Sequence, residues 1–263
     1  MTLCETFREQ SYRTWMQLRK ARSINHQLLE ESITDFLMME LKYNHPLDIQ
    51  TITFNKHQEG KNGADWEWWF VDSAGIKGIG FRVQAKIINF KTDSFLKLHY
   101  KNQTQKLISQ AKSVSPNLIP IYCLYTHSDK LLKLKPFHIG QILFNYTIEH
   151  FGCSILSAEK VQKLKSANKN TLLDLVNEIY PWHLLVCPNG SESPNNNLPE
   201  RVNEFVKDNI LTPKTDKSIS SYLREVPEYI RNISKKSYRE NQKENDEFYL
   251  EDLKGIMIIQ DKN

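Results

Sequence analysis

Two segments of the chain place charged or amide side chains on one face of a strand whose other face is apolar. Residues 65–70 carry Asp65 and Glu67 between tryptophans. Because the side chains of a strand alternate between its faces, both carboxylates project to the same side. Residues 80–87 form a second strand, and its apolar face leaves a polar face opposite. The residues of that polar face are Arg82, Gln84 and Lys86.

This combination of groups suits phosphodiester hydrolysis. Carboxylate oxygens hold Mg²⁺, which polarises the phosphate and helps to generate hydroxide, and a positioned cation stabilises the developing negative charge. On this interpretation Asp65 is the principal metal ligand, Gln84 offers a neutral carbonyl ligand and Glu67 is a second carboxylate. Lys86 orients or activates the attacking water.

A hairpin is expected to bring the two polar faces together. The turn at 73–78 contains glycines and lies between strands expected at 66–71 and 79–88. Asp65 and Gln84 are 84 − 65 = 19 residues apart, which allows such a hairpin. A strand followed by a crossover should be central and largely apolar, so a polar face at this place indicates a site.

A helix expected at 25–43 supplies a further acidic residue. With about 100° per residue and Ile33 at zero, Glu30 lies at about +60°, within the apolar stripe, and Glu31 at about 160°, outside it. The stripe consists of Leu29, Ile33, Phe36, Leu37 and Leu41. A carboxylate on a packing face needs a partner or a metal, so Glu30 is preferred to Glu31 as a supporting metal ligand.

The other patterns predict a mixed α/β sheet between helices. Helices are expected at 4–21, 25–43, 101–114, 140–151, 157–164 and 171–180, and strands at 49–54, 66–71, 79–88, 119–125, 183–187 and 255–260. Residues 1–188 are expected to form the main domain with an N-terminal helix. Residues 189–200 are expected to be a linker or loop, and 201–263 a charged helical C-terminal extension that ends in a short strand.

Composition indicates a globular protein. Of the 263 residues, 40% are hydrophobic and 25% charged, and the net charge of +4 agrees with a polyanionic partner without requiring one. The four cysteines have no metal-ligand spacing and are interpreted as free thiols of a reducing compartment. No segment has the length of apolar sequence needed to span a bilayer. A cytoplasmic bacterial protein without membrane contact is expected.

The arrangement of Glu30, Asp65 and the Gln84-x-Lys86 pair resembles the PD-(D/E)xK nuclease superfamily. The nearest pattern is that of Mrr-type restriction endonucleases, in which glutamine replaces the acidic residue of (D/E)xK. The longer signature, GADWEW at 63–68 followed by RVQAK at 82–86, is similar to that of an uncharacterised bacterial family with this expected fold. Gln84 lowers the charge available for a metal, which makes Glu67 or Glu30 more necessary.

The resemblance implies a restriction-endonuclease-like fold, with a four-stranded mixed sheet flanked by helices. It implies cleavage of nucleic acid that depends on Mg²⁺, for which Mn²⁺ can substitute, and catalytic roles for Asp65, Gln84 and Lys86. The expected activity is that of an endonuclease acting on double-stranded DNA, in restriction or defence. A homodimer would suit cleavage of both strands.

Nucleic-acid contacts are expected from Arg82 and from lysines around the helix at 101–114, in particular Lys101 and Lys106. Two other functions compete with the nuclease. One is a nucleic-acid-binding protein that has the fold but lacks hydrolysis, and the other is an interaction protein whose polar strand faces merely pair with each other. Metal-dependent cleavage that is lost on replacement of Lys86 or Asp65 separates the first function from the other two.

Overall fold

The computed structural model describes residues 1–54, 64–131, 147–187, 197–210, 221–235 and 253–260. The α-helices in these ranges are α1 (Leu3–Ser23), α2 (Glu30–Asn44), α3 (Gln103–Ser113), α5 (Ala158–Lys165), α6 (Leu172–Leu175), α7 (Leu198–Phe205) and α8 (Glu228–Ser234). The strands are β1 (Ile49–Thr53), β2 (Trp66–Val71), β3 (Lys77–Ile87), β4 (Ile119–Tyr125), β5 (Cys153–Ser157), β6 (Tyr180–Pro181), β7 (Arg224–Glu225) and β8 (Gly255–Gln260).

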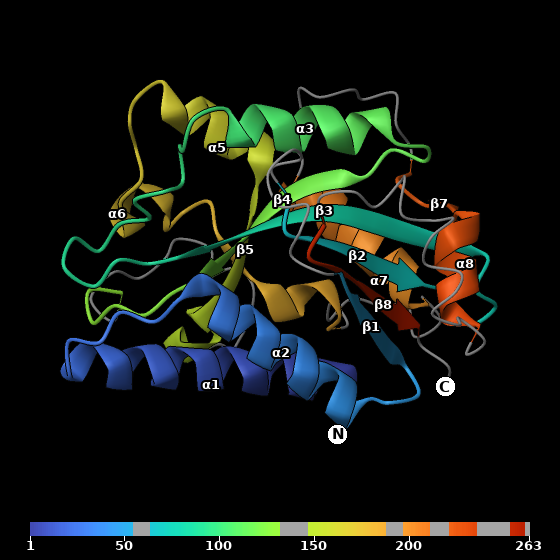
Figure 1. Ribbon diagram of the computed structural model, residues 1–263, viewed down its shortest axis with the longest axis horizontal. Helices are drawn as coiled ribbons and strands as arrows, with labels where there is room; N and C mark the ends of the chain where they lie inside the picture. Colours follow the sequence, from blue (N-terminus) through green and yellow to red (C-terminus); the bar gives the residue numbers. More distant parts are fainter. Residues whose placement is uncertain (55–63, 132–146, 188–196, 211–220, 236–252, 261–263) are drawn as a thin grey trace.

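The strands form one mixed sheet of eight strands (Figure 1). Its order is β1-β8-β2-β3-β4-β5-β6, and β7 pairs with the start of β3. The β2–β3 pair is antiparallel, as the turn at 73–78 predicts, whereas β3–β4 and β2–β8 are parallel. The predicted class of a mixed sheet flanked by helices is therefore confirmed, with eight strands where the resemblance implies four.

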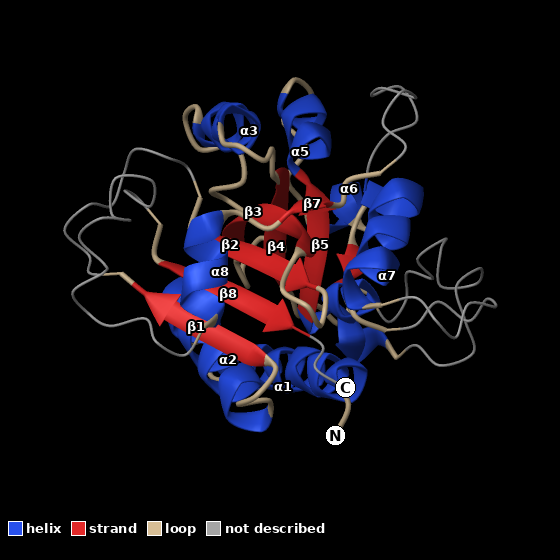
Figure 2. Cartoon of the chain, turned by 90° about the vertical axis from the view of Figure 1, so that its right-hand side faces the viewer, coloured by secondary structure: helices blue, strands red, loops and turns tan. Residues whose placement is uncertain are grey.

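Helices cover both faces of the sheet (Figures 1 and 2). One face packs against α1, α2 and α7, and its core contains Trp68 and Phe81 of β2 and β3. The opposite face packs against α3, α5, α6 and α8, and its core contains Trp69 and Tyr122. The tryptophans of β2 thus alternate between the two cores, where each is almost completely buried.

Local sequence explains where several elements begin. Thr2 caps α1, since its side chain accepts a hydrogen bond from the Glu5 backbone N–H while the Glu5 carboxylate accepts one from the Thr2 N–H. Strand β4 is buried along its whole length, which agrees with its almost wholly apolar sequence. The predicted bounds of β2 and β4 match the structure, and those of α1 and α3 differ by one or two residues.

Some other predicted elements are wrong, and some lie mostly outside the described residues. The strand expected at 183–187 is the 3-10 helix η3 (Trp182–Leu185), and the sheet residues there are Tyr180 and Pro181. The helix expected at 171–180 is limited to α6, and β5 was not predicted. The helix expected at 140–151 lies mostly outside the described residues, and its last residues belong to the 3-10 helix η2 (Ile148–Gly152). Most of the linker expected at 189–200 also lies outside them, and its last three residues are the first residues of α7.

The C-terminal residues complete the central sheet. The apolar run at 255–260 is a strand, as predicted, but β8 lies between β1 and β2, and α7 packs on β2 and β3. The region predicted as an appended extension therefore supplies an interior strand. The strands that carry the candidate site cannot be separated from it.

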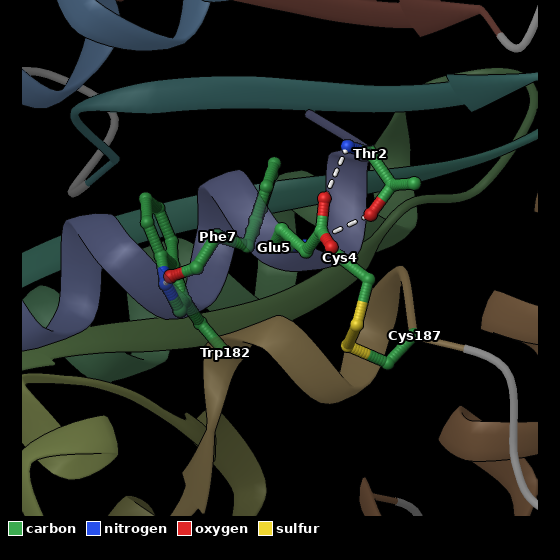
Figure 3. Close-up of a disulfide and its surroundings, with 6 residues drawn as sticks. All are labelled: Thr2, Cys4, Glu5, Phe7, Trp182 and Cys187. Carbon is green, nitrogen blue, oxygen red and sulfur yellow. Dashed lines mark hydrogen bonds between the residues drawn. A yellow bond between two sulfur atoms is a disulfide. The ribbon is translucent and has the colours of Figure 1, made fainter.

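Four contacts fix α1 to residues 152–187 of the chain. Cys4 and Cys187 form a disulfide beside the first turn of α1, where the Phe7 and Trp182 rings pack at 4.6 Å (Figure 3). The Trp182 Nε1–H donates to the Phe7 carbonyl oxygen at 2.8 Å. At Gly152, an added Cβ would lie 2.0 Å from the Ser11 carbonyl oxygen of α1. The prediction of four free cysteines is wrong for one pair; Cys123 and Cys153 are free and buried.

None of the helices within the described ranges combines the length and the apolar character required to cross a bilayer.

Candidate active site at the start of β2 and the end of β3

Asp65 lies immediately before β2, where backbone contacts hold it on two sides. Its N–H donates to the Val83 carbonyl oxygen of β3, and its own carbonyl oxygen accepts from the Lys254 N–H, both at 2.8 Å. The carboxylate is nearly buried, at 9% exposure of the residue. Its Oδ2 accepts from the Ala85 N–H at 2.9 Å and from the Gln84 Nε2. Asp65 and Gln84, which the sequence predicts to converge, are therefore in direct contact.

Gln84 connects Asp65 to helix α3. Its Nε2 faces the Asp65 carboxylate, and its Oε1 accepts a hydrogen bond of 2.7 Å from Nε2 of Gln103, the first residue of α3. The residue is almost completely buried. The Gln84 amide is thus held between a carboxylate and a second amide, and the start of α3 is fixed beside the site.

Lys86 and Glu30 form the second half of the cluster. Lys86 Nζ is 3.9 Å from Glu30 Oε1, at the start of α2. Burial raises the pKa of Glu30 to about 7; the Lys86 ammonium opposes this rise and the Asp65 charge adds to it. Burial also lowers the pKa of Lys86, although the charges of Glu30 and Asp65 favour its ionised form. The preference for Glu30 is therefore supported by position.

The apolar stripe used to place Glu30 differs from the one observed. Leu29 and Phe36 are exposed, at 68% and 56%. The buried residues of α2 are Ile33, Thr34, Leu37, Met38 and Leu41. Glu30 precedes Ile33 and Thr34 by three and four residues, so it still lies on the buried face.

Lys254 is a member of the cluster that sequence reasoning missed. It directly precedes β8, and its Nζ lies 3.3 Å from Asp65 Oδ1 and 3.2 Å from Glu31 Oε1. Burial alone would lower the pKa of Lys254, but the carboxylates of Asp65 and Glu31 outweigh burial and hold it above its ordinary value. The parallel register that places Trp66 opposite Gly255 brings Lys254 beside Asp65. No local motif marks such a residue.

Glu67 is engaged elsewhere, although it was expected to be a metal ligand. It is completely buried, and its Oε2 is 3.0 Å from Nε of Arg82, the residue directly opposite in the hairpin. Its Oε1 accepts from the Trp69 Nε1–H at 2.6 Å and from the Tyr229 hydroxyl. Oε1 of Glu67 thus accepts two hydrogen bonds, and Oε2 is in an ion pair with Arg82 without a hydrogen bond. The expected role of Arg82 in nucleic-acid contact is also wrong, because Arg82 is buried in this ion pair.

The lysines expected to contact nucleic acid lie on the surface near α3. Lys101 and Lys106 are both exposed, and Gln103, between them in sequence, contacts the site through Gln84. Exposed Lys97 interacts electrostatically with Glu30 and Lys86. A basic surface thus adjoins the cluster at the start of α3.

A family model for a family of unknown function (DUF6615) matches residues 3–263. The chain belongs to this family. The match spans nearly the whole chain, so it includes β8 and Lys254 as well as the hairpin that carries Asp65 and Lys86. No curated protein matches this DUF6615 chain.

The donor atoms of the DUF6615 site fit a divalent cation with few protein ligands. Mg²⁺ prefers oxygen ligands, keeps several waters and is commonly held by one or two carboxylates. Asp65 and Glu30 offer two carboxylates, and the amide oxygen of Gln84 would have to exchange its hydrogen bond from Gln103 for the metal. Within the described residues, no group of three or more His, Cys, Asp or Glu side chains could hold a metal, so a site of this kind rests on two carboxylates and an amide.

Proposed function

We propose that this protein is a metal-dependent phosphodiesterase that acts as an endonuclease on nucleic acid. One observation carries the proposal: Asp65, Gln84, Lys86 and Glu30, which come from two strands and a helix, meet in one cluster. The mixed order of β2, β3 and β4 agrees with the restriction-endonuclease-like arrangement that the motif implies. Asp65, Gln84 and Glu30 would hold the metal.

The buried groups of the cluster also support the proposal. Glu30 and Asp65 repel each other, and burial disfavours the charge of Glu30, so a divalent cation would stabilise both ionised carboxylates. The ion would supply polarisation of the phosphate and a more acidic bound water. Mg²⁺ is the expected metal, and Mn²⁺ can substitute for it.

The residues of the chain would then have separate tasks. Lys86, anchored by burial and by Glu30, donates to a phosphate oxygen and stabilises its increasing negative charge. The attacking water gives up a proton to the solvent as its oxygen forms the new bond to phosphorus. The bond to the leaving oxygen breaks, and the leaving oxygen takes up a proton from the solvent. Lys97, Lys101 and Lys106 bind the phosphates on either side of the cleaved bond.

Double-stranded DNA is the proposed substrate, with restriction or defence as its setting, and a homodimer would place two sites for cleavage of both strands. A specific observation favours one alternative, a binding protein without catalysis. The Lys254 ammonium already pairs with the Asp65 carboxylate that a metal would need.

Cleavage assays distinguish the two functions. Supercoiled plasmid, single-stranded DNA and RNA are incubated with the protein in Mg²⁺, in Mn²⁺ and in EDTA. We expect plasmid cleavage that EDTA abolishes and that Asp65→Asn abolishes, while Asp35→Asn, an exposed carboxylate change on α2, retains it. Plasmid binding without cleavage in either metal would favour the inactive alternative.

A further inference from the structure

The backbone of Lys254 is held on both sides by the sheet. Its N–H donates to the Asp65 carbonyl oxygen and its own carbonyl oxygen accepts from the Phe54 N–H, each at 2.8 Å. The next residue, Gly255, is close-packed, since an added Cβ would lie 2.4 Å from the Ile52 carbonyl oxygen. The position of Lys254 is therefore set by the interior strand β8 and not by a loose end of the chain.

The Lys254 side chain projects into the carboxylates of the site. Its Nζ is within 3.3 Å of both Asp65 Oδ1 and Glu31 Oε1. Among the ion pairs of the described residues, Lys254 is the cation at Asp65, whereas Lys86 pairs with Glu30. The other Asp65 oxygen, Oδ2, already accepts two hydrogen bonds from Gln84 and Ala85. A cation that binds Asp65 must therefore share or displace the Lys254 contact.

We propose that Lys254 is an internal counter-ion that competes with the divalent cation for Asp65 and thereby sets the affinity of the site for metal. The inference rests on the proposed function. Without metal, the ammonium neutralises the Asp65 carboxylate and occupies its Oδ1 in an ion pair. When metal binds, the ammonium leaves Oδ1 and remains paired with Glu31, whose side chain is 50% exposed and can follow it.

Removal of the Lys254 charge changes the metal affinity in opposite directions for a structural and for a competing lysine. A merely structural lysine would, on removal, loosen the carboxylates and weaken metal binding. A competing lysine would, on removal, strengthen metal binding by up to about fivefold, the factor that one partly exposed ion pair contributes. The side chain of Lys254 retains 29% exposure, so neutral replacements can be accommodated at its end.

The test is a Mn²⁺ titration of the full chain, in which calorimetry measures the heat of binding and electron paramagnetic resonance measures the free ion. Lys254→Met and Lys254→Gln are expected to lower the dissociation constant for Mn²⁺ by about two- to fivefold. Lys254→Arg, which keeps the charge, is expected to stay near the wild-type value, and so is Lys42→Met, an exposed lysine at the far end of α2. Thermal unfolding of each variant shows that it is folded, and the Gln variant serves if the Met variant is not.

The possible failures can be told apart. If the wild type binds Mn²⁺, Asp65→Asn does not, and both neutral variants bind no more tightly than the wild type, the role of Lys254 is refuted and the metal site stands. If neither the wild type nor the neutral Lys254 variants bind Mn²⁺, the proposed function fails together with the inference. Tighter binding in Lys254→Arg as well would also refute the competition, because that variant keeps the cation.

Discussion

The ion pair between Glu67 and Arg82 provides a test of which carboxylates belong to the site. Glu67→Gln removes the charge of the carboxylate and keeps its shape, so Arg82 is left buried without its counter-ion. The matched change is Glu67→Gln with Arg82→Met, which removes both charges. The metal-ligand interpretation of Glu67 predicts a loss of metal binding in both variants, whereas the observed geometry predicts a loss of stability in the first.

The magnitude follows from burial. Glu67 is 0% and Arg82 4% exposed, and their charged atoms are 3.0 Å apart. Removing one partner of such a buried pair costs about 3–5 kcal/mol, since the remaining charge is uncompensated. Removing both leaves no buried charge, so the double variant is expected to regain a large part of that loss. The Trp69 and Tyr229 hydrogen bonds to Glu67 Oε1 are weakened in both variants and largely cancel in the comparison.

The assay combines urea unfolding with Mn²⁺ titration of the folded protein. We expect Glu67→Gln to lower the free energy of unfolding by about 3–5 kcal/mol, the double variant to lower it less, and both to bind Mn²⁺ as the wild type does. A loss below about 1 kcal/mol in Glu67→Gln, the range of exposed pairs, would refute the structural role. Loss of Mn²⁺ binding equal to that of Asp65→Asn would show that Glu67 is a ligand after all.

Three further predictions concern the packing of the chain. Gly152→Ala places a Cβ 2.0 Å from the Ser11 carbonyl oxygen and should destabilise the fold by about 3 kcal/mol or more; an unchanged urea midpoint would contradict this close approach. Reduction of the Cys4–Cys187 disulfide, which closes 183 residues of chain, should lower stability by up to about 5 kcal/mol. The Cys4→Ser/Cys187→Ser variant should show no effect of reductant, and free thiols at both cysteines of the oxidised wild type would disprove the pairing. Burial first, and then the neighbouring His150 and Arg8, lower the pKa of His183 to about 2 from 6.5. Below pH 6.5 the unfolded chain therefore binds a proton that the folded chain does not, so the free energy of unfolding falls by about 2 kcal/mol on going to pH 5. The His183→Gln variant should lose this part of the pH dependence. An equal dependence of stability on pH in both proteins would exclude His183 as its source.

The features that the sequence predicts well are those encoded locally. The alternation of tryptophans and carboxylates in β2 places Asp65 and Glu67 on one face, and the short turn after Val71 makes the hairpin with β3 a local event. Asp65 and Gln84 therefore meet as predicted. Strand β4 is nearly all apolar and is bounded by turn signals, which gives it the correct limits.

The register of the hairpin also indicates the partner of Glu67, which the metal-ligand interpretation does not take into account. Glu67 and Arg82 are direct cross-strand neighbours in its register, and opposite charges at such positions attract. A buried carboxylate needs a cation, and here the cation is an arginine rather than a metal.

Features that depend on distant pairing could not be predicted. Lys254 meets Asp65 because β8 enters the sheet beside β2, which joins residues 254 − 65 = 189 positions apart. The apolar run at 255–260 predicts a strand but does not tell where that strand pairs. The exposure of Phe36 could not be predicted for the same reason. The spacing of apolar residues along α2 does not reveal whether a neighbouring element covers each of them.

The central claim is that the cluster around Asp65 cleaves phosphodiester bonds with Lys86 in direct contact with phosphate. The rate of a single cleavage turnover tests this claim most directly. The measurement is single-turnover plasmid cleavage at saturating Mg²⁺ by the wild type, Lys86→Met and Lys42→Met, the last a lysine about 18 Å along α2 from Glu30. The claim predicts a rate lower by about 10²–10³-fold in Lys86→Met, with Mn²⁺ binding retained, and an unchanged rate in Lys42→Met. Equal cleavage by Lys86→Met and the wild type, or no metal-dependent cleavage by the wild type, would contradict it.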